Sequence, residues 1–349
     1  MQILKDVPLS DYSTMRLGGV ANYLTKINDR DEISEVLTWA NNRQLPILVI
    51  GGGSNIVWRD EGFSGLVIVN HISGYDLKSF DETTASLTIG GGENWDQVVE
   101  QTVKAGYYTL APLSLIPGTA GAAPVQNIGA YGSQLSDALS DLEAYDLHKN
   151  KFVTFLGSEC DFGYRTSRFK STDKNRFLIT KITVQLDKNS PKKEEMYHSL
   201  NSYLTENDIQ TRTPQVIRDA VVNIRNSKLP DPKTVANCGS FFANPIITTS
   251  ELKRILDAYP DLASWHSKFI WELPNEMVKI AAGALLEHAG YKDFHDPITG
   301  MATWSKQALV LVNEHAKNTA DLLIFKQKII DTIQQKYHIT LEQEPELLP

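Results

Sequence analysis

Two glycine-rich segments could bind a phosphate group. Residues 51–55 (Gly-Gly-Gly-Ser-Asn) directly follow an apolar run, and residues 117–132 are mostly small. Consecutive backbone N–H groups in such turns can point at one anion, and missing side chains let the anion come close. A plain tight turn is the alternative for the first segment, and close packing of two elements is the alternative for the second. The residues alone predict a diphosphate cradle without naming the nucleotide.

Neither segment fits a named nucleotide motif. The pattern GxGxxG would need glycine where Ile56 stands, and GxxxxGK[ST] does not occur. The histidines show no HxxxH or HExxH spacing, and Cys160 and Cys238 form no CxxC pair. We therefore expect no metal site and two reduced thiols.

Three polar residues elsewhere could handle protons or charge. Ser240 stands between a glycine and two phenylalanines, without a GxSxG elbow, so it could donate a proton but is not a hydrolase nucleophile. Arg165 follows an aromatic-glycine turn and could meet a carboxylate or a flat ring. Glu346 stands beside an apolar terminal stretch, where desolvation would raise its pKa and let it act as an acid. A turn serine and a solvated tail are the alternatives for Ser240 and Glu346.

Alternating α and β patterns must position these residues. Apolar positions from residue 31 to 40 recur at helical spacing, and apolar runs at 46–50 and 66–69 predict buried strands. Asn94 should cap another helix, which Gly106 should end.

The second half of the chain carries mainly helical patterns. Thr213 and Pro214 should begin a helix that ends before Pro230, and residues 229–233 read as a stiff linker at a domain boundary. Further helices are predicted at 250–258, 278–289 and 319–337. A strand at 338–341 should be the only element after them, and should return to an earlier sheet.

Composition limits the classes of function. With 349 residues, 42% hydrophobic and 22% charged, the chain should fold into two or three domains. The formal charge of −8, without a basic run, disfavours nucleic acid as a partner. We see neither a signal peptide nor an apolar stretch of about 18 residues that could span a membrane, so the cytoplasm is the expected compartment.

Taken in order, the motifs resemble the UDP-N-acetylenolpyruvoylglucosamine reductase family, flavoenzymes that complete UDP-N-acetylmuramate for peptidoglycan. The resemblance extends over nearly the whole chain. It rests on residues 13–19, 51–55, 116–118, 124–132, 162–165, 228–233, 239–242, 307–311 and 344–346.

The resemblance implies a mixed α/β (α+β) fold, in which an FAD-binding module of the p-cresol methylhydroxylase type precedes a substrate domain. The first FAD-binding subdomain would comprise residues 1–70, joined by a C-terminal strand within 338–349. The second would comprise residues 71–228, and the α+β substrate domain residues 229–337. A monomer is expected.

The resemblance also assigns roles to single residues. Arg165 and Glu346 would stabilise the reaction intermediate, and Ser240 would protonate it. The UDP-sugar would be contacted by Lys228, Asn244, Lys292 and Gln307, and in the longer subfamily a tyrosine loop, here with Tyr197, closes over it. Non-covalently bound FAD would be held by Gly51, Gly52, Gly53, Ser54, Asn55, Pro117, Gly118, Ala122, Gln126, Asn127, Gly129, Ala130, Tyr131 and Arg225.

Three activities compete on this basis. The first is the reductase, which would take hydride from NADPH. The second is an alcohol or sugar oxidase of the same cofactor fold; such oxidases often tether flavin through histidine or cysteine, which both glycine-rich segments lack. The third is a non-catalytic nucleotide-binding module, which would leave Arg165, Ser240 and Glu346 without a shared purpose.

Overall fold

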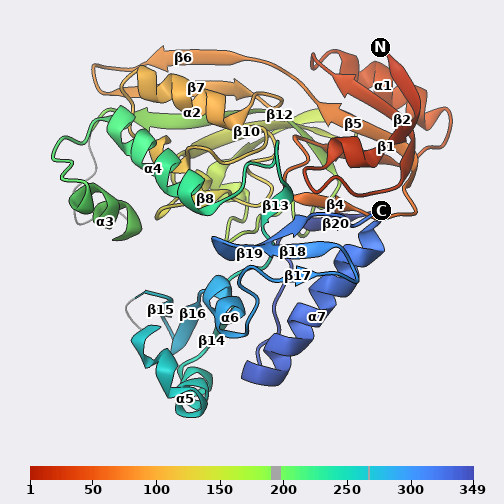
Figure 1. Ribbon diagram of the computed structural model, residues 1–349. Helices are drawn as coiled ribbons and strands as arrows, with labels where there is room; N and C mark the ends of the chain where they lie inside the picture. The colour runs from red at the N-terminus through yellow and green to blue at the C-terminus, as the bar shows by residue number, and fades with distance from the viewer. Residues whose placement is uncertain (190–197, 266–267) are drawn as a thin grey trace. The chain divides into compact units, whose positions relative to one another are not determined.

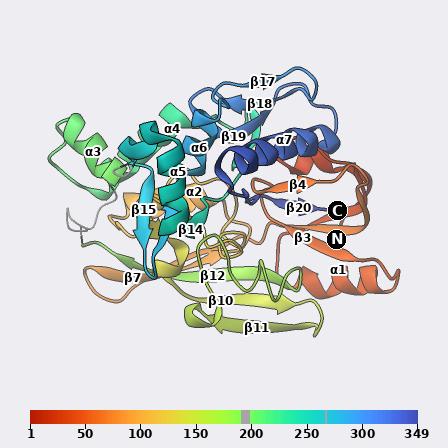
Figure 2. The ribbon, with the colours of Figure 1, turned by 90° about the horizontal axis from the view of Figure 1, so that it is seen from below.

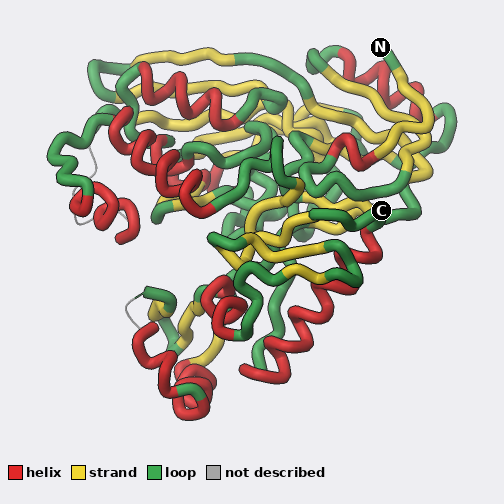
Figure 3. The backbone as a smooth tube through the Cα atoms, in the orientation of Figure 1, coloured by secondary structure: helices red, strands yellow, loops and turns green. Residues whose placement is uncertain are grey.

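The computed structural model describes residues 1–189, 198–265 and 268–349. The chain forms two compact units, each built from separate stretches. The first unit comprises Met1–Pro8, Val20–Gly53 and Phe63–Ser227, and the second comprises Leu9–Gly19, Ser54–Gly62 and Lys228–Pro349. Helices and strands are present in both (Figure 3), so the predicted mixed α/β class is confirmed. Among the described residues, no helix is both long and apolar enough to cross a bilayer.

The smaller sheet of the first unit has the strand order β1-β2-β5-β3. Its strands are β1 (Ile3–Pro8), β2 (Val20–Ile27), β3 (Ile47–Ile50) and β5 (Phe63–Asn70). Both β2 and β3 run parallel to β5. Helix α1 (Glu32–Asn41) packs on this sheet through its predicted apolar stripe, which includes Ile33 and Val36. Strand β3 thus ends where the first glycine-rich segment begins.

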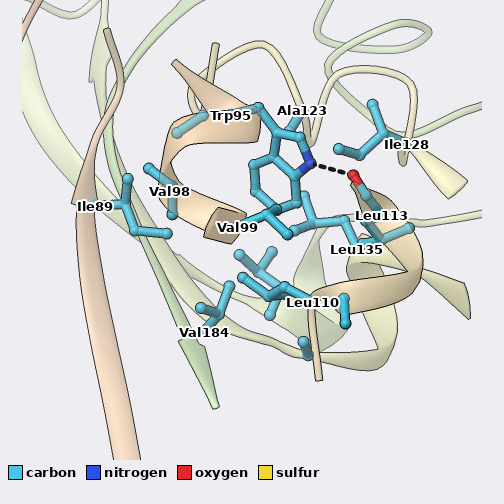
Figure 4. Close-up of a cluster of buried hydrophobic side chains, with 14 of the residues drawn as sticks. Ile89, Trp95, Val98, Val99, Leu110, Leu113, Ala123, Ile128, Leu135 and Val184 are labelled. Atoms are coloured by element: carbon cyan, nitrogen blue, oxygen red, sulfur yellow. Dashed lines mark hydrogen bonds between the residues drawn. The ribbon is translucent and has the colours of Figure 1, made fainter. Parts of the chain in front are cut away.

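The larger sheet of the first unit is antiparallel, with the order β11-β10-β12-β7-β6; Figure 2 shows β7, β12, β10 and β11 in sequence. Its strands are β6 (Tyr75–Ser79), β7 (Thr84–Gly90), β10 (Leu139–Asp146), β11 (Lys151–Leu156) and β12 (Phe177–Asp187). Helices α2 (Trp95–Lys104) and α4 (Pro214–Lys228) lie along it (Figure 1). Both contribute to the same apolar core, and Figure 4 shows the part of it around Trp95, Val98 and Val99 of α2. The first unit also contains α3 (His198–Glu206) and the short strands β8 (Gly129–Ala130) and β9 (Ser133–Gln134).

The second unit contains two small sheets and three α-helices among its described residues. One sheet has the order β13-β19-β18-β17 and the other β14-β16-β15. The strands are β13 (Ala236–Ser240), β14 (Ile246–Thr248), β15 (Ile270–Leu273), β16 (Met277–Ile280), β17 (His295–Asp296), β18 (Met301–Trp304) and β19 (Gln307–Asn313). The helices are α5 (Thr249–Ala258), α6 (Ala282–His288) and α7 (Thr319–Tyr337). A separate parallel pair joins β4 (Ile56–Trp58) to β20 (Glu346–Leu348).

Several predicted elements of the second half were wrong. The helix expected at 278–289 is divided, because Met277–Ile280 form β16 and only Ala282–His288 are helical. No strand lies at 338–341; the last strand is β20, and strands β13 to β19 were missed. Short apolar runs do not distinguish a strand from a helix by periodicity alone, and the pairing of β20 depends on a distant partner. The helices predicted at 250–258 and 319–337 are confirmed as α5 and α7.

Candidate active site

The two glycine-rich segments meet backbone to backbone within the first unit. A Cβ atom on Gly52 would lie 3.2 Å from Cα of Gly118, and one on Gly51 would lie 2.5 Å from Oγ1 of Thr119 and 3.0 Å from Cβ of Ala122. Any side chain at Gly51 would therefore displace its neighbours. Where Gly52 and Gly118 approach each other, the surface is formed by main-chain atoms rather than side chains. A phosphate cradle requires such exposed backbone N–H groups.

Two polar atoms of this region are enclosed without a hydrogen-bond partner among the described residues: Oγ1 of Thr119 and Nε of Arg225. Arg225 lies on α4. Burial lowers the pKa of Arg225, and its charge interacts with Tyr131, Asp96 and Arg165. Enclosed polar groups without partners are rare in folded proteins because they are costly. A bound anionic nucleotide would satisfy both atoms, so the residues present fit a cofactor such as FAD.

Asn127 holds the second glycine-rich segment in shape. Its backbone is left-handed, with φ of 47°, and the residue is buried. Its Nδ2 group lies 3.2 Å from acceptors on Gln134, Ser136 and Gly163, while its Oδ1 accepts the N–H of Ser136. The side chain of this predicted cofactor residue therefore bonds within the protein. Its bond to Gly163 also reaches the turn that carries Arg165.

Arg165 is joined to the same segment. Its Nη2 donates a hydrogen bond to the carbonyl oxygen of Gly129 over 2.8 Å, and its guanidinium lies 5.2 Å from the ring centroid of Tyr164. The Arg165 backbone is left-handed, with φ of 55°, and its side chain is half-buried. The first unit thus brings this predicted catalytic cation to the predicted cofactor loop.

Within the second unit, the residues that follow Ser240 are hydrogen-bonded to the residues that precede Glu346. Ser240 ends β13, opposite Val310 of β19. The next residues pair with the C-terminal segment, because Ala243 N–H donates to Glu342 and Glu344 N–H donates to Phe241. Glu346 follows two residues after Glu344, at the start of β20.

Open space adjoins Ser240. Gly239 has a left-handed φ of 76°, and a Cβ atom there would meet nothing within 4 Å. Its N–H donates to the Asn237 side chain, which fixes the bend. On the other side, the N–H of Glu346 donates to the carbonyl oxygen of Asn55. The segments that carry Ser240 and Glu346 are therefore neighbours, and open space adjoins the backbone at Gly239, next to Ser240.

Two predicted substrate residues meet at the start of α6. Oδ1 of Asn244 accepts the N–H of Ala282 at 2.9 Å. A Cβ atom on Gly283 would lie 2.6 Å from Oε1 of Gln307, so the glutamine side chain lies against the same helical turn. Lys292 instead follows the far end of α6, where its exposed ammonium pairs with Glu287 at 3.2 Å.

The remaining predicted residues are placed as follows. Ser54, Asn55, Gln126, Ala130 and Tyr131 are half-buried, Gly53 is buried, and Pro117 and Lys228 are exposed. Tyr197 lies outside the described residues. Sequence reasoning missed Thr119, although it stands inside the second glycine-rich segment, because a single hydroxyl among small residues gives no motif.

Comparison with known proteins identifies the families that the chain resembles. Residues 21–153 match the FAD binding domain family, and residues 231–348 match the C-terminal domain of UDP-N-acetylenolpyruvoylglucosamine reductase. The reductase of Ralstonia nicotianae is 38% identical over 341 residues, which cover 97% of each chain. That of Alcanivorax borkumensis is 38% identical over 349 residues, covering 99% of this chain and 96% of the relative.

A solved structure is similar in fold. The reductase of Thermus caldophilus superposes with a TM-score of 0.67 at 22% identity, covering 100% of this chain and 98% of that one. The predicted resemblance is confirmed by the matches along almost the whole sequence, and the FAD-binding module followed by a reductase C-terminal domain is confirmed with it. The chain belongs to the UDP-N-acetylenolpyruvoylglucosamine reductase family.

Proposed function

We propose that this protein reduces UDP-N-acetylglucosamine enolpyruvate to UDP-N-acetylmuramate for peptidoglycan, using NADPH and FAD. The observation that carries the proposal is that main-chain hydrogen bonds join the segments that carry Ser240 and Glu346, with open space at Gly239 next to Ser240. An oxidase that removes hydride from an alcohol has no need of a serine proton donor with a second acid on a neighbouring segment. The family relationship also favours the reductase over the oxidase.

The glycine-rich segments would hold the cofactor. Gly51 and Gly52 allow the main chain to approach a diphosphate, and Thr119 and Arg225 offer it an enclosed hydroxyl and an enclosed cation. When bound, FAD would take up hydride from NADPH and supply hydride to the enolpyruvyl double bond. The protein contributes orientation and charge stabilisation around that chemistry.

The chain's own side chains would handle the charge and the proton. Reduction of the enolpyruvyl ether at its β-carbon leaves negative charge on the α-carbon and its carboxylate. Arg165 would face this charge with a guanidinium fixed by its bond to Gly129, and a protonated Glu346 would donate a hydrogen bond to it. Ser240 would give its hydroxyl proton to the α-carbon.

The Ser240→Ala variant tests this assignment because it separates the two half-reactions. We expect NADPH to bleach the bound flavin at the normal rate, while substrate reoxidises it at least about a hundredfold more slowly, as for loss of a general acid. Ser264→Ala, an exposed serine of the same unit, is the matched control and should leave both rates unchanged. Normal reoxidation in Ser240→Ala would remove the serine from the mechanism.

The finer assignments complete the proposal. Residues 1–70 and 71–228 would form the FAD-binding subdomains, and residues 229–337 the substrate domain. The pairing of β20 with β4 supports a return of the C-terminal segment to residues 1–70. Lys228, Asn244, Lys292 and Gln307 would contact the UDP-sugar, and Tyr197 would close over it. We further propose that the protein is cytoplasmic and monomeric. Size-exclusion chromatography can check the oligomeric state.

A further inference from the structure

The first turn of α2 is hydrogen-bonded at three points to the second glycine-rich segment and the residues just before it. The Trp95 N–H donates to the carbonyl oxygen of Gly118 over 3.1 Å, and its indole N–H donates to that of Leu113 over 3.0 Å (Figure 4). Asp96, the next residue, accepts the N–H of Leu115 on Oδ1 over 2.5 Å. One end of α2 thus fixes the main chain from Leu113 to Gly118, through one main-chain bond and two side-chain bonds.

The hydrogen bond from the Leu115 N–H to Asp96 stabilises an unfavourable backbone conformation. Its backbone is left-handed, with φ of 59°, a conformation that a Cβ atom disfavours. The bend it makes leads directly into Ile116, Pro117 and Gly118, the stretch that packs against Gly52. If Leu115 relaxed to a common conformation, Gly118 would leave the cradle.

Asp96 is itself held by an ion pair from α4. Nη1 and Nη2 of Arg218 lie 2.6 and 2.9 Å from its two carboxylate oxygens, and Arg218 is buried. Burial would raise the pKa of Asp96, but the hydrogen bonds from Arg218 and Leu115 outweigh it and lower the pKa. The carboxylate is therefore charged at neutral pH and aligned by a two-point contact.

Asp96, the carboxylate of this pair, also interacts with Arg225. Arg218 and Arg225 lie two helical turns apart on α4, which puts both side chains on one face of the helix. Arg225 is a second cation that interacts with Asp96. One carboxylate thus sets the position of α4, with its enclosed cation, relative to the loop that carries Thr119.

We propose that Asp96 and Arg218 are positioning residues for the FAD site: the pair holds Leu115 in its left-handed turn and so keeps the cradle in its binding shape before the cofactor arrives. This inference rests on the proposed function only in naming FAD as the occupant. The predicted consequence is a loss of cofactor affinity that exceeds the loss of stability.

The test compares two aspartates in the full-length chain. Asp146, also in the first unit, is likewise paired with an arginine: Nε and Nη2 of Arg176 both donate to its Oδ2, and its Oδ1 accepts the backbone N–H groups of His148 and Lys149. It provides the matched control. After removal of flavin, Asp96→Ala should raise the dissociation constant for FAD about tenfold or more, as expected for the loss of charge-assisted hydrogen bonds, while Asp146→Ala should change it less than about twofold. Both variants should melt at lower temperature.

Hydrogen exchange supplies a readout that does not depend on FAD. The Leu115 amide should exchange faster in Asp96→Ala and at the normal rate in Asp146→Ala. If Asp96→Ala folds poorly, Arg218→Lys, which keeps one contact with the carboxylate, should show the same effects more weakly. Leu115→Gly adopts the left-handed turn without strain, so Asp96→Ala should weaken FAD binding less in that background.

The outcomes separate the two claims. Equal FAD affinity in Asp96→Ala and the unaltered protein, or equal losses in the two aspartate variants, would overturn the positioning role. An unaltered protein that binds no FAD would instead refute the proposed function. In that case the exchange rate of the Leu115 amide still decides whether Asp96 holds the loop.

Discussion

The guanidinium of Arg165 donates a hydrogen bond to the carbonyl oxygen of Gly129, 2.8 Å away. A residue proposed to meet charge on the substrate is thereby tied to a residue of the proposed flavin loop. Asn127 strengthens the connection, since its side chain reaches Gly163 in the Arg165 turn. The proposed catalytic cation and the cofactor loop of the first unit are therefore joined by hydrogen bonds.

Arg165→Lys should separate charge from geometry. Lysine keeps the positive charge but cannot present the planar fork that bonds Gly129 while facing an anion. We expect reoxidation of the reduced flavin by substrate to slow about a hundredfold, the usual cost of one misplaced stabilising donor, with flavin reduction by NADPH unchanged. Stopped-flow absorbance measures both rates. Arg168→Lys, in the same turn region but paired with Asp173, should leave both intact.

Gly51→Ala should reduce cofactor binding through steric overlap. The new Cβ atom would lie 2.5 Å from Oγ1 of Thr119, which forces the two glycine-rich segments apart. FAD affinity, measured by quenching of flavin fluorescence, should fall at least about tenfold. Adding Thr119→Ala removes the overlapping hydroxyl and should restore part of the affinity. A double variant that binds no better than Gly51→Ala would argue against overlap as the cause.

Arg225→Met should affect stability and binding in opposite directions. The Nε group of Arg225 is enclosed without a partner among the described residues, and burial lowers the pKa of this arginine, so its charge opposes folding of the flavin-free chain. We expect the flavin-free variant to melt at the same or a higher temperature, and to bind FAD about tenfold more weakly. Arg254→Met, at an exposed position, should change neither quantity. Lower stability with normal FAD affinity would contradict the assignment.

Ionisation of Asp146 should make the free energy of unfolding depend on pH in the acidic range. The hydrogen bond from Arg176 outweighs burial and lowers the Asp146 pKa in the folded state. Its stabilising effect is therefore complete above the ordinary aspartate pKa of about 3.9, and is lost as the pH falls through the lower folded-state value. Asp146→Asn should be about 2 kcal/mol less stable at pH 7, and the difference should narrow below about pH 4. Urea unfolding of both proteins from pH 7 to 3 measures this difference in the free energy of unfolding. If the difference stayed constant over this range, the ionised Asp146 carboxylate would not be its source.

The substrate residues of the second unit should differ in importance. Gln307 lies against the first turn of α6, as Asn244 does, whereas Lys292 is exposed and paired with Glu287. Gln307→Ala should raise KM for the UDP-sugar about tenfold with little change in kcat, because it removes binding common to substrate and transition state. Lys292→Ala should raise KM less than about twofold, as for a solvated ion. The reverse order would assign the sugar contact to Lys292.

Local patterns predicted the elements that carry their own signals. The stripe from Ile33 to Ala40 is buried in α1, and Asn94 caps α2 through the N–H of Gln97, as its position before the apolar face indicated. The loop between Ala111 and Gly132 contains only short helical and strand pieces. Such features depend on neighbours in sequence, which a pattern can register.

Long-range pairings could not be predicted in this way. Val278 looked like part of a helix, but antiparallel pairing with β14 and β15 makes Met277–Ile280 a strand. Arg218 and Asp96 lie 122 positions apart, so no local pattern relates them. The motifs named candidate residues for the site, whereas the bonds that hold Leu115 and Arg165 became visible only in the folded chain.

The pairing of Glu346 with Ile56 brings together segments from opposite ends of the sequence. Closing so long a loop costs chain entropy, and β20 has only three residues with which to offset it. Contacts of this kind form late in folding and open early. We therefore expect the carboxylate proposed to act as an acid to be assembled after the glycine loops and lost before them, which would give a state that retains flavin but has no acid in place.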